Sequence, residues 1–175
     1  QETENITIYG NVGTVTVDVN GGSTAKEVAA SINSVQGTTG VYATAQTRMN
    51  ISFPDQASAT QDTVKFNLYG KNDSAIQIAA NVEFGVTSGR SANLTSLAGA
   101  INGTTGKTGI TATLDVTKSK MTLLSNEGYD IVIEDYELIN LAAPNLVASG
   151  ADRDLADVGN SISVTENLDP NTVQV

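Results

Sequence analysis

The sequence predicts an α+β protein made of two tandem β-rich units, each an antiparallel sheet with one short helix packed on it, with the termini close together. Two observations support this prediction: a helix–loop–strand stretch occurs twice, and short alternating segments surround both copies. The 16 Gly and 3 Pro among 175 residues also favour many turns over long helices. We expect units at residues 1–58 and 59–141, then an acidic return segment, 142–175, whose late strands pack on the first unit.

The duplicated stretch is residues 23–45, which align without a gap with residues 92–114 after a shift of 69 positions. Identical residues fall on one another at several points of this alignment, namely Asn33 on Asn102, Gly37 on Gly106, Gly40 on Gly109, and Ala43-Thr44 on Ala112-Thr113. Apolar positions align as well. The match therefore indicates an internal duplication.

Each copy begins with a pattern that predicts a helix. Thr24 followed by Glu27 has the spacing of a capping box, and Asn93 stands at the corresponding start of the second helix. Apolar residues then recur with helical spacing, so we expect one face of each helix to be buried through Val28, Ile32, Leu97 and Ile101. Gly37 and Gly103 follow the last apolar positions, where we expect left-handed helix ends.

The remaining elements are expected to be strands, because apolar and polar residues alternate in them. A hairpin precedes the first helix, and the ending Ile-Tyr-Gly10 is echoed by Leu-Tyr-Gly70 in the second unit. We expect a break at residues 142–157. The expected strands are residues 5–9, 13–19, 41–45, 48–53, 63–70, 75–84, 110–116, 121–125, 129–135, 161–165 and 172–175.

The charge is concentrated near the end of the chain. Residues 1–126 hold nine acids and eight bases, and residues 127–175 hold ten acids and one base, which together give the net −10. An acidic chain without a basic patch is repelled by nucleic acids and anionic lipid, so we expect neither as a partner. The absence of cysteine excludes disulfides and thiolate chemistry.

Three short motifs match, in order, those of serine penicillin-binding enzymes: Ser23-Thr-Ala-Lys26, Ser91-Ala-Asn93 and Lys107-Thr-Gly109. Structural roles explain them better, because the second leads into a helix cap and the third is the counterpart of Thr38-Thr39-Gly40. The chain has no His, which excludes an imidazole base. We therefore expect no enzyme activity, no catalytic residues and no cofactor.

Acidic residues offer two further alternatives. Glu134 could pair with Asp135 or Glu137, but neighbours on a strand face opposite sides, so a solvated acidic face is the better interpretation. Residues 152–157 could offer oxygen ligands to Ca²⁺, although they lack the Gly and the distal Glu of an EF-hand loop. We assign no metal site.

Five Asn-x-Ser/Thr triplets are also present. They begin at Asn5, Asn50, Asn72, Asn93 and Asn102. Chance explains most of them in a chain this rich in Asn, Ser and Thr, and the expected cap at Asn93 argues against a glycan there.

The two copies carry a resemblance to a known family. A capped helix ending in Ile32-Asn33 or Ile101-Asn102, then a Gly-containing loop, then Gly40-Val-Tyr-Ala-Thr44 or Gly109-Ile-Thr-Ala-Thr113, resembles the flagellin IN motif. That motif occurs in outer domains of bacterial flagellins and in hook-associated and filament-cap proteins. The resemblance covers about a quarter of the chain directly.

The resemblance implies a structural role: a surface-exposed outer domain of a flagellin, located outside the cell in the flagellar filament. It implies neighbouring flagellin subunits as partners, a part in antigenicity and host immune recognition, and O-glycosylation of exposed Ser and Thr in some members. The alternatives are a hook-associated or cap protein, or an extracellular adhesin module that binds calcium near residues 152–157. Because the chain opens at Gln1, we expect it to be a piece of a longer protein, and with few aromatics and a net −10 we expect it to be monomeric when isolated.

Overall fold

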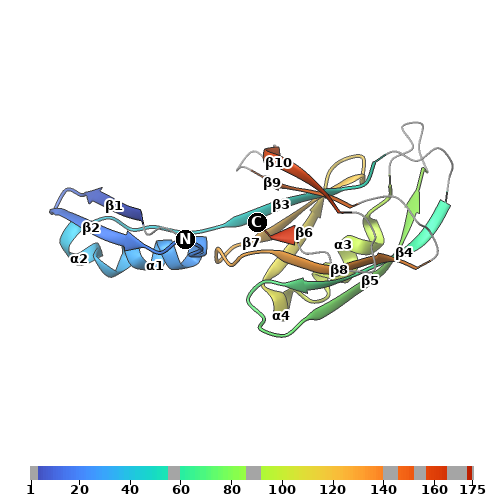
Figure 1. Cartoon of the computed structure of the whole chain (residues 1–175), viewed down its shortest axis with the longest axis horizontal. Coiled ribbons are helices and arrows are strands. Elements are labelled where there is room, and N and C mark those ends of the chain that lie inside the picture. Colours follow the sequence, from blue (N-terminus) through green and yellow to red (C-terminus); the bar gives the residue numbers. More distant parts are fainter. Residues whose placement is uncertain are drawn as a thin grey trace. The chain divides into compact units, whose positions relative to one another are not determined.

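The computed structural model describes residues 4–54, 60–85, 92–139, 146–151, 157–164 and 173–174 (Figure 1). The chain divides into two compact units. Unit 1 consists of Gln1–Thr47 and the short segment Asn126–Tyr129, and unit 2 consists of Arg48–Ser125 and Asp130–Val175. The boundaries expected at 58/59 and 141/142 lie outside the described residues.

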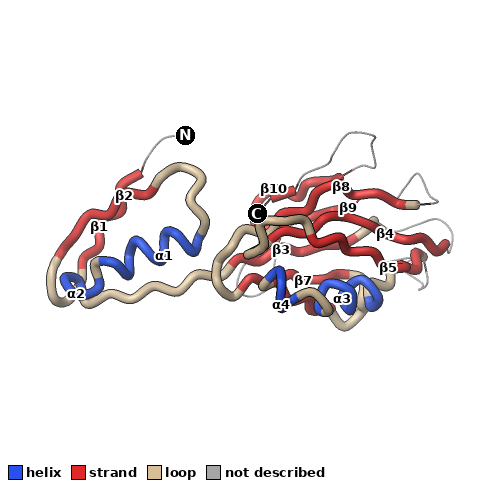
Figure 2. Tube along the Cα trace, turned by 90° about the horizontal axis from the view of Figure 1, so that it is seen from below, coloured by secondary structure: helices blue, strands red, loops and turns tan. Residues whose placement is uncertain are grey.

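Unit 1 is a hairpin with two helices. Strands β1 (Glu4–Tyr9) and β2 (Thr14–Val19) pair antiparallel, with Ile6 opposite Val17. The long helix α1 (Ala25–Ser34) and the single turn α2 (Gln36–Thr39) both pack against β2. Figure 2 shows α1 running beside the hairpin and an extended segment leading from α2 to the next strand.

Unit 2 contains two antiparallel sheets and a second pair of helices, α3 (Thr95–Asn102) and α4 (Thr105–Thr108). One sheet has the order β10-β9-β3-β7-β6, and the other has the order β11-β8-β4-β5. Helix α3 packs against β5 and β6. The strands are β3 (Thr47–Ser52), β4 (Thr60–Tyr69), β5 (Ile76–Phe84), β6 (Ile110–Leu114), β7 (Lys120–Ser125), β8 (Val132–Leu138), β9 (Leu146–Ala151), β10 (Asp157–Val164) and β11 (Val173–Gln174).

The α+β class predicted from the sequence is confirmed. The hydrophobic core lies in unit 2, where strands from both sheets and helix α3 contribute fully buried side chains. At one place the Phe53 and Phe84 rings meet edge to face, with centroids 5.3 Å apart, which is a favoured aromatic geometry. The core is built mainly from Val, Ile, Leu, Phe and Met.

Burial differs between the two helices. Leu97 and Ile101 are fully buried, as predicted, but Val28 and Ile32 are only half-buried, so the prediction that they are buried was wrong for α1. The reason is the number of covering elements. Helix α1 packs against β2 of a two-stranded hairpin, whereas α3 packs against strands of two larger sheets.

Several expected strand positions also need correction. Residues 41–45 form no strand, whereas their counterparts form β6, because β6 has β7 beside it and residues 41–45 have no such neighbour in the described chain. The expected break at 142–157 contains β9 over Leu146–Ala151, which finds a partner in β3. The strand expected at 129–135 begins only at Val132, since the Asn126–Tyr129 segment belongs to unit 1.

The expected left-handed glycines were also misplaced. Gly103 has φ −62°, and Gly37 lies inside α2. The left-handed residues are Gly40 and Gly109, with φ of 73° and 71°. In each copy a short second helix, α2 or α4, follows the first, so the helical region ends at these later glycines.

The late strands pair within unit 2. β10 pairs with β9, β9 with β3, and β11 with β8, while β1 pairs with β2. The described residues therefore do not show β1 beside a late strand. The terminal residues themselves lie outside the described part, and the closeness of the termini stays a prediction.

Candidate functional site

The most distinctive feature of the molecule is an asparagine clamp that occurs in both units. Asn33 on α1 accepts a hydrogen bond from the N–H of Ala43 at 2.7 Å and donates one to its C=O at 2.9 Å. Asn102 on α3 bonds Ala112 in the same way, at the same two distances. The side-chain amide thus replaces a neighbouring strand, because it satisfies both backbone groups of one residue.

A buried threonine sets the turn that precedes each clamped segment. The Thr39 hydroxyl donates to the C=O of Val35 at 3.0 Å and accepts from the N–H of Val41 at 3.2 Å. Thr108 makes the corresponding bonds to Thr104 and Ile110, and both threonines have an exposed fraction of 0%. Each hydroxyl is therefore used as donor and acceptor within the motif rather than presented to a ligand.

The hairpin turn docks on the same threonine in both units. A Cβ on Gly10 would lie 1.8 Å from the Thr39 carbonyl oxygen, and one on Gly70 would lie 2.3 Å from that of Thr108. Only glycine permits this approach. The repeat therefore includes the hairpin. The alignment with a shift of 69 positions does not reach it, because Gly10 and Gly70 are 60 positions apart.

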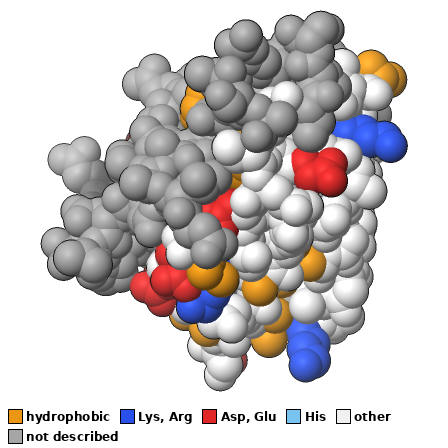
Figure 3. Space-filling model, turned by 90° about the vertical axis from the view of Figure 1, so that its right-hand side faces the viewer, with side chains coloured by type: hydrophobic (Ala, Val, Ile, Leu, Met, Phe, Trp, Pro, Cys, Tyr) orange, Lys and Arg blue, Asp and Glu red, His pale blue; other side chains and the backbone are white. Residues whose placement is uncertain are grey.

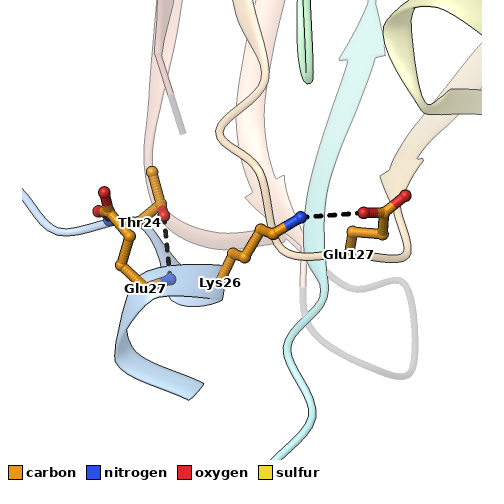
Figure 4. Close-up of polar contacts among 4 residues, drawn as sticks. All are labelled: Thr24, Lys26, Glu27 and Glu127. Atoms are coloured by element: carbon orange, nitrogen blue, oxygen red, sulfur yellow. Dashed lines mark hydrogen bonds and ion pairs between the residues drawn. The ribbon is translucent and has the colours of Figure 1, made fainter. Parts of the chain in front are cut away.

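Unit 1 has a contact that sequence reasoning missed (Figure 4). Lys26 Nζ lies 3.0 Å from Glu127 Oε2 and 3.9 Å from the centroid of the Tyr129 ring. The Lys26 N–H also donates to the Gly128 carbonyl at 2.9 Å, so the Asn126–Tyr129 segment satisfies a free amide at the start of α1. Gly128 has φ 74°, and this glycine in a polar stretch is the signal in the sequence that marks the turn.

The start of α1 is completed by the predicted capping box. The Thr24 hydroxyl accepts from the Glu27 N–H at 3.2 Å (Figure 4). The Glu27 carboxylate accepts from the Thr24 N–H at 2.8 Å. In the second copy Leu94 is the capping residue and has no side-chain bond, while Asn93 accepts from the Thr95 N–H at 3.1 Å. The cap predicted at Asn93 is thus displaced by one residue.

These positions explain the motifs that resemble a serine enzyme. Contact with Tyr129, and secondly with Glu127, raises the pKa of Lys26, which is the opposite of what a lysine base requires. Asn93 serves the start of α3, and Lys107 lies in α4, in a different unit from Lys26. Ser91 lies outside the described residues.

The acidic strand β8 carries a bulge. Lys65 pairs with Glu137 and Asn67 with Glu134, so two residues of β8 face one residue of β4, and Asp135 has φ 52°. The expectation that Glu134 and Asp135 face opposite sides was therefore wrong.

The carboxylates of Glu134, Asp135 and Glu137 lie on the solvent-facing side of the sheet and interact with residues of β4. Asn67 donates to Asp135 at 2.6 Å, Lys65 forms an ion pair with Glu137, and Tyr69 is bonded to Glu134. The pKa of Tyr69 is raised, first by burial and then by this bond to Glu134. The three carboxylates are thus paired with neighbouring strand residues rather than with one another.

The asparagines of the glycosylation triplets also have structural roles. Asn50 is buried and accepts from the Thr122 hydroxyl at 2.7 Å, and Asn72 spans the β4–β5 turn through bonds to Gly70, Leu68 and Ser74. Asn93 lies at a helix start and Asn102 is part of the clamp, so four of the five asparagine side chains form hydrogen bonds within the protein. Asn5 lies exposed on β1.

No group of three or more acidic side chains in the described residues is arranged to hold a metal ion. The candidate calcium ligands at 152–156 lie outside those residues, and Asp157 begins β10. In the described part of the face that Figure 3 shows, a few acidic, basic and hydrophobic side chains are scattered among uncharged polar side chains and backbone. None of the described helices has the length and hydropathy needed to cross a membrane.

Two comparisons with known proteins bear on this arrangement. A search of curated proteins finds no match. Residues 5–52, a little over a quarter of the chain, match the family model of the Flagellin hook IN motif. The matched range runs from β1 to β3 and includes the first clamp and its threonine, so the similarity to this motif covers the helix, turn and clamped segment of unit 1.

Proposed function

We propose that the chain is an outer domain of a bacterial flagellin, exposed on the surface of the extracellular filament. The observation that carries this proposal is the match of residues 5–52 to the flagellin motif, together with the recurrence of the same clamp in unit 2. On this proposal the chain contains two copies of the motif, of which the second has diverged in its surroundings. Its role is structural and non-enzymatic on this proposal, supported by the ion pair of Lys26 with Glu127 and by the bond of Asn93 at the start of α3.

Neighbouring flagellin subunits are the proposed partners, and the domain contributes to the surface, motility and antigenicity of the filament. The described helices support a position outside the filament core. The longest, α1, has 10 residues, too few for the sustained heptads of a coiled coil. Polymerisation would then depend on other parts of the parent protein.

A hook-associated or filament-cap protein is the second candidate, favoured by the hook in the description of the matching motif. Antibodies against the chain distinguish the two in electron micrographs of whole flagella. We expect labelling along the filament if the proposal is correct. Labelling confined to the hook junction or the tip would favour the second candidate, and labelling of the cell surface away from flagella would favour an adhesin.

A deletion tests the outer-domain role more directly. Residues 1–175 are removed from the parent protein, and a short linker joins the flanking segments. We expect filaments that assemble but are thinner and support altered motility, because an inserted domain with adjacent ends can be excised at low cost. If the shortened parent is exported and folded but forms no filament, the outer-domain role is wrong.

A further inference from the structure

Two asparagines of the chain are followed directly by glycine: Asn20 by Gly21 just after β2, and Asn102 by Gly103 at the end of α3. Such a step is chemically labile, because glycine has no Cβ and leaves its amide nitrogen open to approach by the asparagine side chain. All four residues are exposed. Solvent access therefore does not distinguish the two steps, and the difference between them lies in their hydrogen bonds.

The step in unit 2 is held at both of its reacting groups. The Asn102 side chain accepts from the Ala112 N–H at 2.7 Å and donates to the Ala112 C=O at 2.9 Å, so its amide is fixed at β6. The Gly103 N–H donates to the Gly99 carbonyl at 2.9 Å. An N–H that is used as a donor exchanges its proton only after local opening. Attack on the Asn102 amide therefore requires both the clamp and the last turn of α3 to open.

The step in unit 1 has neither restraint. Within the part of the chain that the structure describes, the Asn20 side chain forms no hydrogen bond and the Gly21 N–H has no acceptor. Both residues belong to the turn between β2 and α1, which is closed by a bond from the Ser23 N–H to the Asn20 C=O at 3.0 Å. Gly22 has φ 87°, the positive value that a type II turn requires at its third residue. The Gly21 amide is therefore open to water and to its neighbouring side chain.

The geometry points to Asn20 as a site of spontaneous covalent modification, namely deamidation through a succinimide. The Gly21 amide nitrogen loses its proton to water and attacks the Asn20 Cγ, and the side-chain nitrogen leaves as ammonia. Water then opens the cyclic imide at either of its carbonyls, which gives aspartate or isoaspartate. The net reaction consumes a water molecule, releases ammonia and leaves a new carboxylate in the turn.

Either product alters the connection between β2 and α1. Aspartate adds a negative charge to a chain of net charge −10. Isoaspartate also adds a carbon to the main chain, because the peptide then runs through Cβ. This carbon lies between Val19 and the carbonyl that accepts from the Ser23 N–H, so the turn is displaced relative to β2. Since α1 packs against β2, we expect faster amide hydrogen exchange in α1 after modification.

This inference goes beyond the proposed function and does not rest on it, because the reaction needs only water and the folded chain. The chain cannot reverse the modification, so the modified fraction increases with time. It also increases with the pH of the medium, because the reaction begins with loss of a proton from the Gly21 amide. Unit 1 would thus be modified sooner than unit 2, although the two share the same motif.

Peptide mapping by mass spectrometry tests the assignment within one molecule, because both steps follow a β-branched residue, Val19 or Ile101, and are matched in local sequence. The whole chain is incubated in mildly alkaline buffer made with heavy-oxygen water, which marks each new carboxylate. We expect Asn20 to be converted about tenfold or more faster than Asn102, because the reaction at Asn102 waits for local opening. In urea the two rates should agree within about twofold. Equal rates in the folded chain, no conversion at either site, or aspartate without isoaspartate would overturn the inference.

Two glycine variants separate the chemistry from its structural consequence. Gly21→Ala should slow the conversion of Asn20 about tenfold, because the new Cβ hinders the attack. Gly103→Ala is the matched control and should leave the conversion of Asn20 unchanged. Circular dichroism confirms that each variant is folded, and hydrogen exchange is compared before and after ageing.

Faster exchange in α1 is expected after ageing of the original chain and of Gly103→Ala, and not of Gly21→Ala. Rapid conversion of Asn20 in folded Gly21→Ala would contradict the succinimide route. Unchanged exchange in a fully converted chain would contradict the effect on α1. Neither readout requires a filament, so failure here leaves the proposed function standing.

Discussion

Unit 1 and the matching part of unit 2 share one motif but are stabilised in different ways. Both contain a hairpin, two helices, a buried threonine and an asparagine clamp. In unit 2 these elements are part of a two-sheet structure with a continuous hydrophobic core. Among the described residues of unit 1, the buried apolar side chains are those of Ile8 and Ala29. The Asn126–Tyr129 segment supports the start of α1. The polar motif is thus common to both, and the hydrophobic support is not.

The largest expected difference in stability concerns the apolar side chains of α1 and α3 that face the rest of the protein. Replacing Ile101 with Ala should lower the free energy of unfolding by about 2–5 kcal/mol, because the side chain is fully buried. Ile32→Ala should cost about 1 kcal/mol, since Ile32 is half-buried. Urea denaturation combined with amide hydrogen exchange in α1 and α3 measures both. Equal costs would show that α1 is covered as fully as α3.

The clamp should also be more costly to remove from unit 2. Asn102→Ala leaves both backbone groups of the buried Ala112 without their partner and should cost about 1–3 kcal/mol. Asn33→Ala should cost less, because Ala43 is half-buried and water can replace the amide. Asn→Asp at each site is the control, since it keeps the acceptor and removes the donor. A larger loss at Asn33 would mean that unit 1 depends on the clamp more than unit 2 does.

The support of α1 by the Asn126–Tyr129 segment can be removed separately. Gly128→Ala should destabilise unit 1 by about 1–2 kcal/mol from its left-handed φ alone. The added Cβ would also lie 2.4 Å from that of Ala45. Faster hydrogen exchange in α1, with α3 unchanged, is the expected readout. Gly106→Ala, at a helical glycine with open space around its Cβ, is the control.

The smallest effect is a pH dependence confined to unit 2. Burial alone would raise the pKa of Asp115, but bonds from the Thr117 hydroxyl and from the N–H groups of Lys120 and Ser119 outweigh it and lower the pKa below 3.8. The corresponding residue in unit 1 is Gln46. Because the folded pKa is depressed, its stabilisation is present above pH 3.8 and is lost as the pH falls through the folded pKa. Asp115→Asn should remove this dependence, and acid titration of the unfolding midpoint of both proteins measures it.

The sequence predicted the repeated motif well because its signals are local. The Thr24–Glu27 capping box and the burial of Leu97 and Ile101 follow from spacing within about twenty residues. Features that depend on distant partners were missed. Whether 41–45 or 110–114 becomes a strand depends on a neighbour, and both segments alternate equally well. Nothing local to Lys26 indicates a partner at Glu127.

The contact between Lys26 and Gly128 joins residues 102 positions apart, and this sets an order of events in folding. The hairpin, α1 and the asparagine clamp involve neighbours in the chain and can form as soon as those residues are free. The Asn126–Tyr129 segment reaches α1 only after a long loop has closed, which is slow and is favoured once β7 and β8 hold its ends. Unit 1 would therefore begin to fold first and finish last. A chain that is synthesised or exported with its amino end first would carry an incompletely stabilised unit 1 until residue 129 had followed.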